Sequence, residues 1–470
     1  MTEPYDLVII GGGAAAFAAS TKANDLGKMA LMINAGLPLG GTCVNVGCVP
    51  SKHLIAVGAE HYYGSRSRFK ALSNGHSSTF DFKTAIEEKR RVVNTLRQKN
   101  YVNVQESQDG VDLIEGRANF ASPGEVEVNG RKYKAERFLI STGASARSLD
   151  IDGLSDVGYL TNETVMDIES LPESMIVIGG GPQGLEIAQM FTHFGSRVTL
   201  VMSHDMILPR EEPVIASELL RVLSEEGIEF RLGVRAMSAT NADDRKTLTI
   251  RSSDGSDEVL SASEIFLAAG LRANTAGLGL GVAGVEVDDR GFIKTDKRYE
   301  TSIPGIYAAG DVIGRLALET TAAKEGSIAA DNALTGGSRS INYDEVPRAV
   351  FTDPEVASVG ITEDEEMEIF NACSCRTIPI DMVPRAEATH ETRGVFKMVI
   401  HPENSKILGV HIVAPHAAEL IHEATLAVKF GLTIDDIIDT VHVFPTLSEG
   451  IKRVAQAFTR DISQMSCCVE

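Results

Sequence analysis

The sequence predicts an α/β protein of several domains, and three observations carry that prediction. The chain has 470 residues, whereas single hydrophobic cores stop growing near ~250 residues. Two apolar strand-like runs are each followed at once by a glycine-rich turn and a helix-forming stretch, at residues 5–26 and 174–195. From Val346 onward a mixed α+β pattern without such a turn takes over.

The composition excludes several classes of protein. With 43% hydrophobic and 23% charged residues, the chain has enough apolar material for large cores. Its net charge of -21 would repel a nucleic-acid backbone, so we expect no nucleic-acid partner. The longest uncharged stretch, residues 29–51, is rich in glycine and proline, so we expect no membrane span. The N-terminus lacks the features of a signal peptide, which predicts a cytoplasmic protein.

The first unit has the order of a dinucleotide-binding turn. The strand Tyr5–Ile10 leads into Gly11 and Gly13, and Ala16 follows in the helix. Gly11 permits the tight turn, Gly13 lets a pyrophosphate approach the helix N-terminus, and Ala16 allows close helix–strand contact. The next strand ends at Asn34, whose amide can hydrogen-bond ribose hydroxyls where an acid is usual.

The second unit repeats this order and predicts a second nucleotide. The strand at 174–178 is followed by a turn with Gly179, Gly181 and Gly184, and then by a helix carrying Glu186. The strand at 197–201 ends without the acid that would repel a 2′-phosphate, which favours NADPH. The residues that follow it are Met202, Ser203 and His204.

Three further runs are expected to complete the two nucleotide sites. The strand 137–141 precedes Thr142 and Gly143, the strand 264–268 precedes Gly270, and a short strand within 301–310 precedes Asp311. The expected domains are a first nucleotide domain (1–150), a second (151–270), a return to the first (271–342) and a C-terminal α+β domain (343–470).

The segment Gly40–Lys52 carries two cysteines five residues apart, Cys43 and Cys48. At a helix start, the helix dipole and the nearby Lys52 should depress a thiolate pKa. With its GGTC and PSK flanks this segment resembles the flavin-dependent pyridine nucleotide-disulfide oxidoreductase family, and the similarity runs through the whole chain in order.

That resemblance implies two Rossmann-like domains for FAD and NAD(P)H and a C-terminal dimerisation domain. Cys48 would face the flavin and Cys43 the substrate, with Lys52 beside the flavin and paired with Glu186. It also implies a homodimer with an active site shared between subunits. The implied FAD contacts are Gly11, Gly13, Ala16, Asn34, Thr42, Lys52, Thr142, Gly143 and Asp311, and the implied NADPH contacts are Gly179, Gly181, Gly184, Ser203, His204 and Gly270.

The C-terminal region points to one branch of the family. Members that act on lipoamide or glutathione carry a proton-transferring histidine where this chain has Phe444, and phenylalanine cannot carry a proton. The adjacent Cys467 and Cys468 are soft-metal ligands, and with the first pair they resemble the members that reduce mercuric ion. This implies NADPH-dependent reduction of Hg(II), delivered by small-thiol complexes, with the metal ligands Cys43, Cys48, Cys467 and Cys468.

Two alternatives stay open at this point. One is a disulfide reductase of the dihydrolipoamide or glutathione type, in which His442 could replace the missing histidine or simply pack. The other is a flavoprotein that sequesters soft metals without turnover. The chain also departs from the mercury-reducing pattern, because we find no N-terminal metal-binding domain, Pro182 stands for a nicotinamide-shielding tyrosine, and Leu271 stands for an arginine. Along a predicted strand, Cys373 and Cys375 would point the same way; half-buried packing is favoured there over metal binding.

Overall fold

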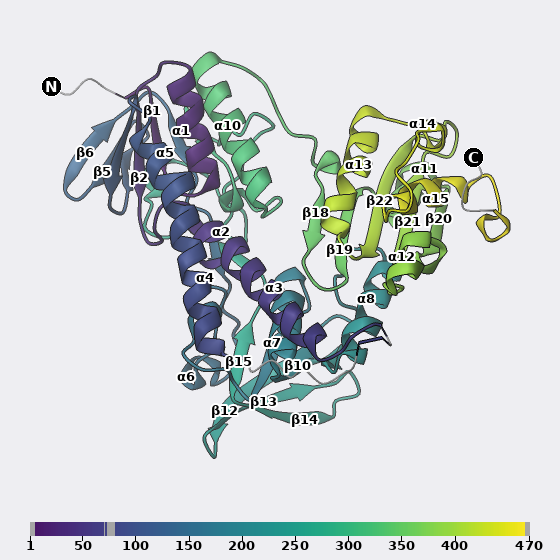
Figure 1. Cartoon of the computed structure of the whole chain (residues 1–470). Coiled ribbons are helices and arrows are strands. Elements are labelled where there is room, and N and C mark those ends of the chain that lie inside the picture. Colours follow the sequence, from purple (N-terminus) through teal and green to yellow (C-terminus); the bar gives the residue numbers. More distant parts are fainter. Residues whose placement is uncertain (1–4, 70, 73–79, 466–470) are drawn as a thin grey trace.

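The first glycine unit lies at the centre of a five-stranded parallel sheet in the computed structural model, which describes residues 5–69, 71–72 and 80–465 (Figure 1). Strand β1 is buried at every position and pairs with β2 and β7. Helices α1 and α10 lie side by side against this sheet. In spatial order the strands are β17 (Ile306–Ala308), β7 (Phe138–Ile140), β1 (Leu7–Ile10), β2 (Ala30–Asn34) and β3 (Val111–Glu115), and the helices are α1 (Ala14–Asp25) and α10 (Glu319–Thr335).

The second glycine unit forms a separate four-stranded parallel sheet. A three-stranded antiparallel sheet, β12 (Arg235–Ala242), β13 (Arg245–Arg251) and β14 (Asp257–Ala262), packs beside it. The chain then returns to the first sheet, because β17 comes from residues that follow this unit. The four strands are β11 (Glu229–Arg231), β10 (Arg197–Val201), β9 (Ser174–Ile178) and β15 (Glu264–Leu267), with helices α7 (Pro182–Phe194) and α8 (Pro213–Glu225).

The segments between these sheets include two long helices that run down the molecule, α3 (Cys48–Gly64) and α4 (Phe82–Arg97) (Figure 1). Two small antiparallel sheets complete this part of the fold. They are β4 (Asn119–Ser122), β5 (Glu125–Val128) and β6 (Arg131–Lys134), and β8 (Ala144–Ala146) with β16 (Leu271–Ala273). The shorter helices are α2 (Gly41–Val46), α5 (Asn103–Glu106), α6 (Leu154–Val157) and α9 (Leu280–Ala283).

The C-terminal part is an antiparallel five-stranded sheet with helices, as its α+β pattern predicts. In spatial order its strands are β18 (Arg348–Val350), β19 (Glu355–Gly360), β22 (Ile407–Ala414), β21 (Val395–Ile400) and β20 (Cys375–Pro379). Its helices are α11 (Glu363–Phe370), α12 (Pro384–Thr389), α13 (Ala417–Phe430), α14 (Ile434–Asp439) and α15 (Glu449–Gln456).

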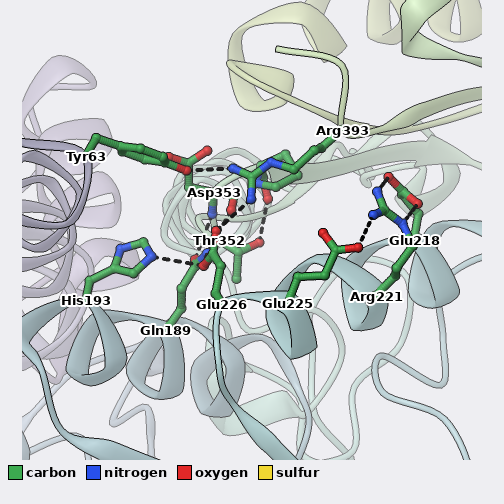
Figure 2. Close-up of polar contacts among 11 residues, drawn as sticks. Tyr63, Gln189, His193, Glu218, Arg221, Glu225, Glu226, Thr352, Asp353 and Arg393 are labelled. Carbon is green, nitrogen blue, oxygen red and sulfur yellow. Dashed lines mark hydrogen bonds and ion pairs between the residues drawn. The ribbon is translucent and has the colours of Figure 1, made fainter. Parts of the chain in front are cut away.

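A buried polar network joins these parts around the carboxylate of Glu226 (Figure 2). Glu226 accepts from Gln189 Nε2 at 2.7 Å and lies 3.0 Å from His193 Nε2, and both partners are on α7. Arg393, next to β21, donates to Glu226 at 2.8 Å and to the Tyr63 hydroxyl of α3 at 2.6 Å. A buried carboxylate needs several donors to offset its desolvation, so this network fixes α3, α7 and the C-terminal sheet relative to one another.

The structure confirms the predicted fold class. Strands β2, β9 and β10 have the limits that the apolar runs predict. Cys48 stands at a helix start, as expected, but the segment with the two cysteines is divided between two helices. Cys43 lies in α2 and Cys48 begins α3, with Gly47 between the two helices. No helix in the described part of the chain is both long and apolar enough to cross a bilayer.

The contact between α1 and α10 provides a stability test. A Cβ atom at Gly326 of α10 would lie 2.1 Å from the Ala15 carbonyl oxygen of α1. We expect Gly326→Ala to destabilise the protein by about 1–3 kcal/mol, the usual range for overpacking, and to lower Tm in thermal denaturation. Gly281→Ala is the matched control, since it also adds a methyl group to a helix but meets no atom within 4 Å. Equal Tm values for both variants would contradict this packing.

Candidate active site

The two cysteines of the Gly40–Lys52 segment are brought together as free thiols. Gly47 makes this possible, because the chain folds back so closely that a Cβ there would lie 3.0 Å from the Thr42 carbonyl oxygen. Gly41 in turn lies against Gly13, where an added Cβ would come within 2.8 Å of the Gly13 Cα. The dithiol is therefore placed directly beside the first glycine turn.

The two thiols have opposite electrostatic environments. The hydrogen bond from the Cys43 thiol and the charge of Lys52 lower the pKa of Cys48, against the effect of burial. The same hydrogen bond, together with burial, raises the pKa of Cys43. Cys48 is also the first residue of α3, where the helix dipole favours a thiolate. The pair thus favours a thiolate at Cys48 and a proton on Cys43.

Lys52 and Glu186 form an ion pair between the two nucleotide units. Lys52 Nζ lies 2.7 Å from Glu186 Oε2, and the Glu186 side chain is only 10% exposed. The other carboxylate oxygen accepts from the backbone N–H of Phe351 at 2.9 Å. The Phe351 ring lies under the Lys52 ammonium, 4.4 Å from its centroid. Phe351, from the C-terminal part of the chain, therefore contacts both members of the predicted ion pair.

Glu319 and Tyr101 are two site residues that the sequence did not reveal. The Tyr101 hydroxyl donates to Glu319 Oε1 at 3.0 Å, and Glu319 also interacts with the Cys43 thiol. Burial raises the pKa of Glu319, although both hydrogen bonds oppose that shift. Glu319 begins α10, far from Cys43 in the chain and outside any short motif, so only the tertiary fold could identify it.

Both glycine turns have the geometry of a pyrophosphate cradle. Gly13 and Gly181 cap α1 and α7 without a side-chain hydrogen bond, and neither helix has an acid in its first turn. The first N–H groups are thus available to an anion. A Cβ at Gly181 would meet no atom within 4 Å, whereas one at Gly11 or Gly179 would lie 2.3 or 2.4 Å from a carbonyl oxygen of the neighbouring strand end. The residues present fit a dinucleotide at each turn.

The other residues expected to contact FAD surround the first turn. Asn34 is buried, and its amide donates to Leu37 O at 3.1 Å and to Glu115 at 3.2 Å. Glu115 ends β3, parallel to β2, so an acid does stand beside the predicted ribose position, on the next strand. The remaining residues lie at helix starts and strand ends. Ala16 is fully buried, Thr42 is exposed and Asp311 follows β17. The Thr142 hydroxyl donates to the Asn274 carbonyl oxygen at 2.8 Å, and a Cβ at Gly143 would meet no atom within 4 Å.

Burial and the neighbouring Glu319 raise the pKa of Asp311 to about 6.

Asn274 holds the backbone at Thr142, since its Nδ2 donates to the Thr142 carbonyl oxygen at 3.0 Å. Its role was not visible in the sequence, because Asn274 belongs to the return segment after β16.

The residues expected to contact NADPH lie at the end of the second sheet. Ser203 and His204 are exposed just after β10, while Met202 is buried under Gly180. Gly184 is required by packing, because a Cβ there would lie 1.9 Å from the Gly179 carbonyl oxygen. Gly270 is exposed and open, and Pro182 is the first residue of α7.

The C-terminal residues divide into two groups. Phe444 is half exposed, and His442 contacts Glu423 Oε1 at 2.8 Å and Thr440 O at 3.0 Å. Both ring nitrogens of His442 are thus engaged within its own chain, which favours a packing role. Cys467 and Cys468 lie outside the described residues.

The prediction for Cys373 and Cys375 was partly wrong. Only Cys375 belongs to strand β20, and Cys373 is exposed in the preceding link, so half-buried packing does not describe it. The two sulfur atoms nevertheless face one another at 3.3 Å.

Comparison with known families agrees with this architecture. Residues 5–326 match the family model described as pyridine nucleotide-disulphide oxidoreductase. Residues 346–455 match the model described as the dimerisation domain of pyridine nucleotide-disulphide oxidoreductase.

Individual relatives cover nearly the whole chain. A protein named mercuric reductase from Lysinibacillus sphaericus is 39% identical, over 99% of this chain and 85% of that protein. One of the same name from Streptomyces lividans is 38% identical over 99% of this chain and 98% of its own. A dihydrolipoyl dehydrogenase from Thermus scotoductus is 36% identical over 97% of each chain. Among solved structures, the Cu(II) complex of the HOCl-induced flavoprotein disulfide reductase RclA from Escherichia coli matches with a TM-score of 0.87 and 28% identity, covering 97% of this chain and all of that one.

The electrostatic contribution of Lys52 can be measured on Cys48. In Lys52→Met we expect the pKa of the Cys48 thiol to rise, because a nearby cation that favours the thiolate is lost. The measurement is the pH dependence of alkylation of Cys48 in the reduced protein, followed by mass spectrometry. Lys28→Met is the control, since Lys28 pairs with Asp6 on the surface. An unchanged profile in Lys52→Met would contradict the assignment.

Proposed function

The chain belongs to the pyridine nucleotide-disulphide oxidoreductase family, and we propose that it is an enzyme that reduces Hg(II) to elemental mercury with electrons from NADPH. FAD and NADPH are its cofactors. The observation that carries the proposal is a redox dithiol, Cys43 and Cys48, in a chain with Phe444 where a disulfide reductase needs a proton carrier.

The dithiol has the properties that Hg(II) capture needs. Thiolates are the preferred ligands of soft cations, and the lowered pKa of Cys48 supplies one thiolate before the metal arrives. Cys43 gives up its proton as it becomes the second ligand, and Glu319 is the carboxylate that interacts with its thiol. Bound FAD and NADPH supply the electron pair that converts Hg(II) to Hg(0). Neutral mercury has little affinity for thiolate and leaves without a general acid, which suits Phe444.

The other residues have supporting roles in this proposal. Lys52 and Glu186 hold the flavin side of the site, and Asn34, Thr142 and Asp311 bind FAD. We assign residues 1–150 and 271–342 to the FAD domain, 151–270 to the NADPH domain and 343–470 to the dimerisation domain. The protein is a homodimer through that last domain, and in our proposal the partner subunit completes the site with the residues from Phe444 to Cys468.

A disulfide reductase is the second candidate, favoured by the 36% identical dihydrolipoyl dehydrogenase. Steady-state NADPH oxidation by the holoenzyme separates the candidates. Our proposal requires turnover with Hg(II), whereas turnover with lipoamide or glutathione disulfide alone would establish the second candidate. Binding of Hg(II) without NADPH consumption would indicate sequestration only.

The choice of nucleotide gives a second test. NADPH should have the higher kcat/KM, because Ser203 and His204 can donate to a 2′-phosphate and Met202 stands directly after β10, where an acid would repel that phosphate. Ser203→Glu should reduce kcat/KM for NADPH much more than for NADH, since a carboxylate would repel the extra phosphate. Ser203→Gln is the uncharged control. Equal or higher efficiency of the parent enzyme with NADH would reject this preference.

The route of the metal gives a third test. In the Cys467→Ala/Cys468→Ala variant, NADPH oxidation should fall to a small fraction of the parent rate when Hg(II) is supplied as a complex with competing small thiols. Thiol-bound Hg(II) passes to Cys43 and Cys48 by ligand exchange, and adjacent thiols provide that relay. With small halide complexes, which reach Cys43 and Cys48 directly, the loss should be much smaller. Parent-like activity with the thiol complex would exclude these cysteines as the entry route.

A further inference from the structure

A second cluster of soft and acidic ligands lies outside the proposed redox site. It consists of Cys373, Cys375 and Glu363, whose ligand atoms all lie within 4.8 Å of one another. Cys373 Sγ is 2.9 Å from Glu363 Oε1 and 3.3 Å from Cys375 Sγ. Cys373 is exposed, and the other two side chains are half-buried, so a cation can reach the cluster from solvent.

The three side chains come from two elements and the link between them. Glu363 is the first residue of α11, whose start is fixed by a capping box between Thr362 and Glu365. Cys375 is the first residue of β20, the edge strand of the C-terminal sheet. The opposite edge strand is β18, which contacts α7, the helix that carries Glu186. Four strand spacings of ~4.8 Å therefore separate β20 and its cysteine from the edge of the sheet that contacts α7.

Ser374, between the two cysteines, is held by hydrogen bonds at both its N–H group and its carbonyl group. The backbone N–H of Ser374 donates to the two carboxylate oxygens of Glu366 at 2.9 and 3.0 Å, and Glu366 is fully buried. The Ser374 carbonyl oxygen accepts from Ile400 N at 2.9 Å. Because the middle residue is held in this way, the flanking sulfur atoms are positioned before any ligand binds, which lowers the ordering cost.

The carboxylate is oriented in the same manner. Glu363 Oε2 forms an ion pair with Lys397 Nζ at 2.5 Å, which leaves Oε1 facing the thiols. Lys397 also pairs with the buried Glu212 at 2.6 Å. Two thiolates, one carboxylate and a divalent cation carry a net charge of -1, and the Lys397 ammonium, which Glu363 shares with Glu212, lies beside this charge.

We propose that Glu363, Cys373 and Cys375 form a binding site for a divalent, thiophilic cation that prefers four ligands, of the Zn(II) and Cd(II) class. With metal–sulfur bonds of ~2.3 Å, tetrahedral coordination places two sulfur atoms ~3.8 Å apart, whereas linear coordination needs ~4.6 Å. The observed 3.3 Å is nearer the tetrahedral value. Water is the fourth ligand, on the exposed side of Cys373. The bound cation would tie α11 to the edge strand β20.

The test uses a full-length variant in which the other four cysteines are replaced by serine: Cys43→Ser, Cys48→Ser, Cys467→Ser and Cys468→Ser. We expect the reduced protein to bind one Cd²⁺ per chain in calorimetry, with thiolate-to-cadmium charge-transfer absorption in the ultraviolet. Zn²⁺ should compete for that site and raise Tm. Ca²⁺ should do neither, because it prefers oxygen ligands.

Two further variants identify the ligands. Adding Cys373→Ser and Cys375→Ser should abolish the stoichiometric binding, and retained binding would overturn the proposal. Glu363→Gln should weaken Cd²⁺ binding by about tenfold or more, whereas Glu368→Gln, on the same helix but outside the cluster, should not. Equal affinity in these two variants would overturn the role of the carboxylate. Since the redox thiols are absent throughout, the outcome is independent of the proposed mercury reduction.

Discussion

The site depends on the contact between α3 and α7, because α3 carries Cys48 and Lys52 and α7 carries Glu186, the ion-pair partner of Lys52. Gly58 of α3 allows the contact, since a Cβ there would lie only 3.3 Å from the side chains of His193 and Phe194. At one end of the crossing Lys52 meets Glu186 at 2.7 Å. The other end is held by the Glu226 network (Figure 2). A partly exposed ion pair contributes little stability alone, so packing and the buried network fix its geometry.

Glycines, which have no side chain, shape the nucleotide-binding part of the site. Helix α2 can lie on the first turn because Gly41 lacks a Cβ, which would come within 2.8 Å of the Gly13 Cα. The N-termini of α1 and α7 are left without side-chain caps, so their N–H groups are free to meet phosphate. Substrate chemistry and cofactor binding therefore share one short stretch of backbone. A side chain at Gly41 would disturb both.

The sequence predicted well what local patterns control. Buried parallel strands are continuous apolar runs, so β2, β9 and β10 could be located to the residue. The break at Gly47 was missed because it arises from a close approach of the chain to itself. Glu319 was missed for a stronger reason: it reaches Cys43 only through the packing of α10 in the first domain. Glu115 was missed because it comes from β3, and only the pairing of β3 with β2 brings it beside Asn34.

The two thiol pairs show how the surroundings of the same residue type decide its chemistry. Cys48 begins a helix and lies near Lys52, and its pKa is lowered, so it is available as a thiolate for exchange and electron transfer. Around Cys375, burial, the Cys373 thiol and Glu363 raise the pKa to about 12. Such a thiol is a poor nucleophile at neutral pH and resists disulfide exchange. A cation can still displace its proton, because metal–thiolate bonds form in competition with protonation. A pair of cysteines thus suits electron transfer in one environment and cation binding in the other.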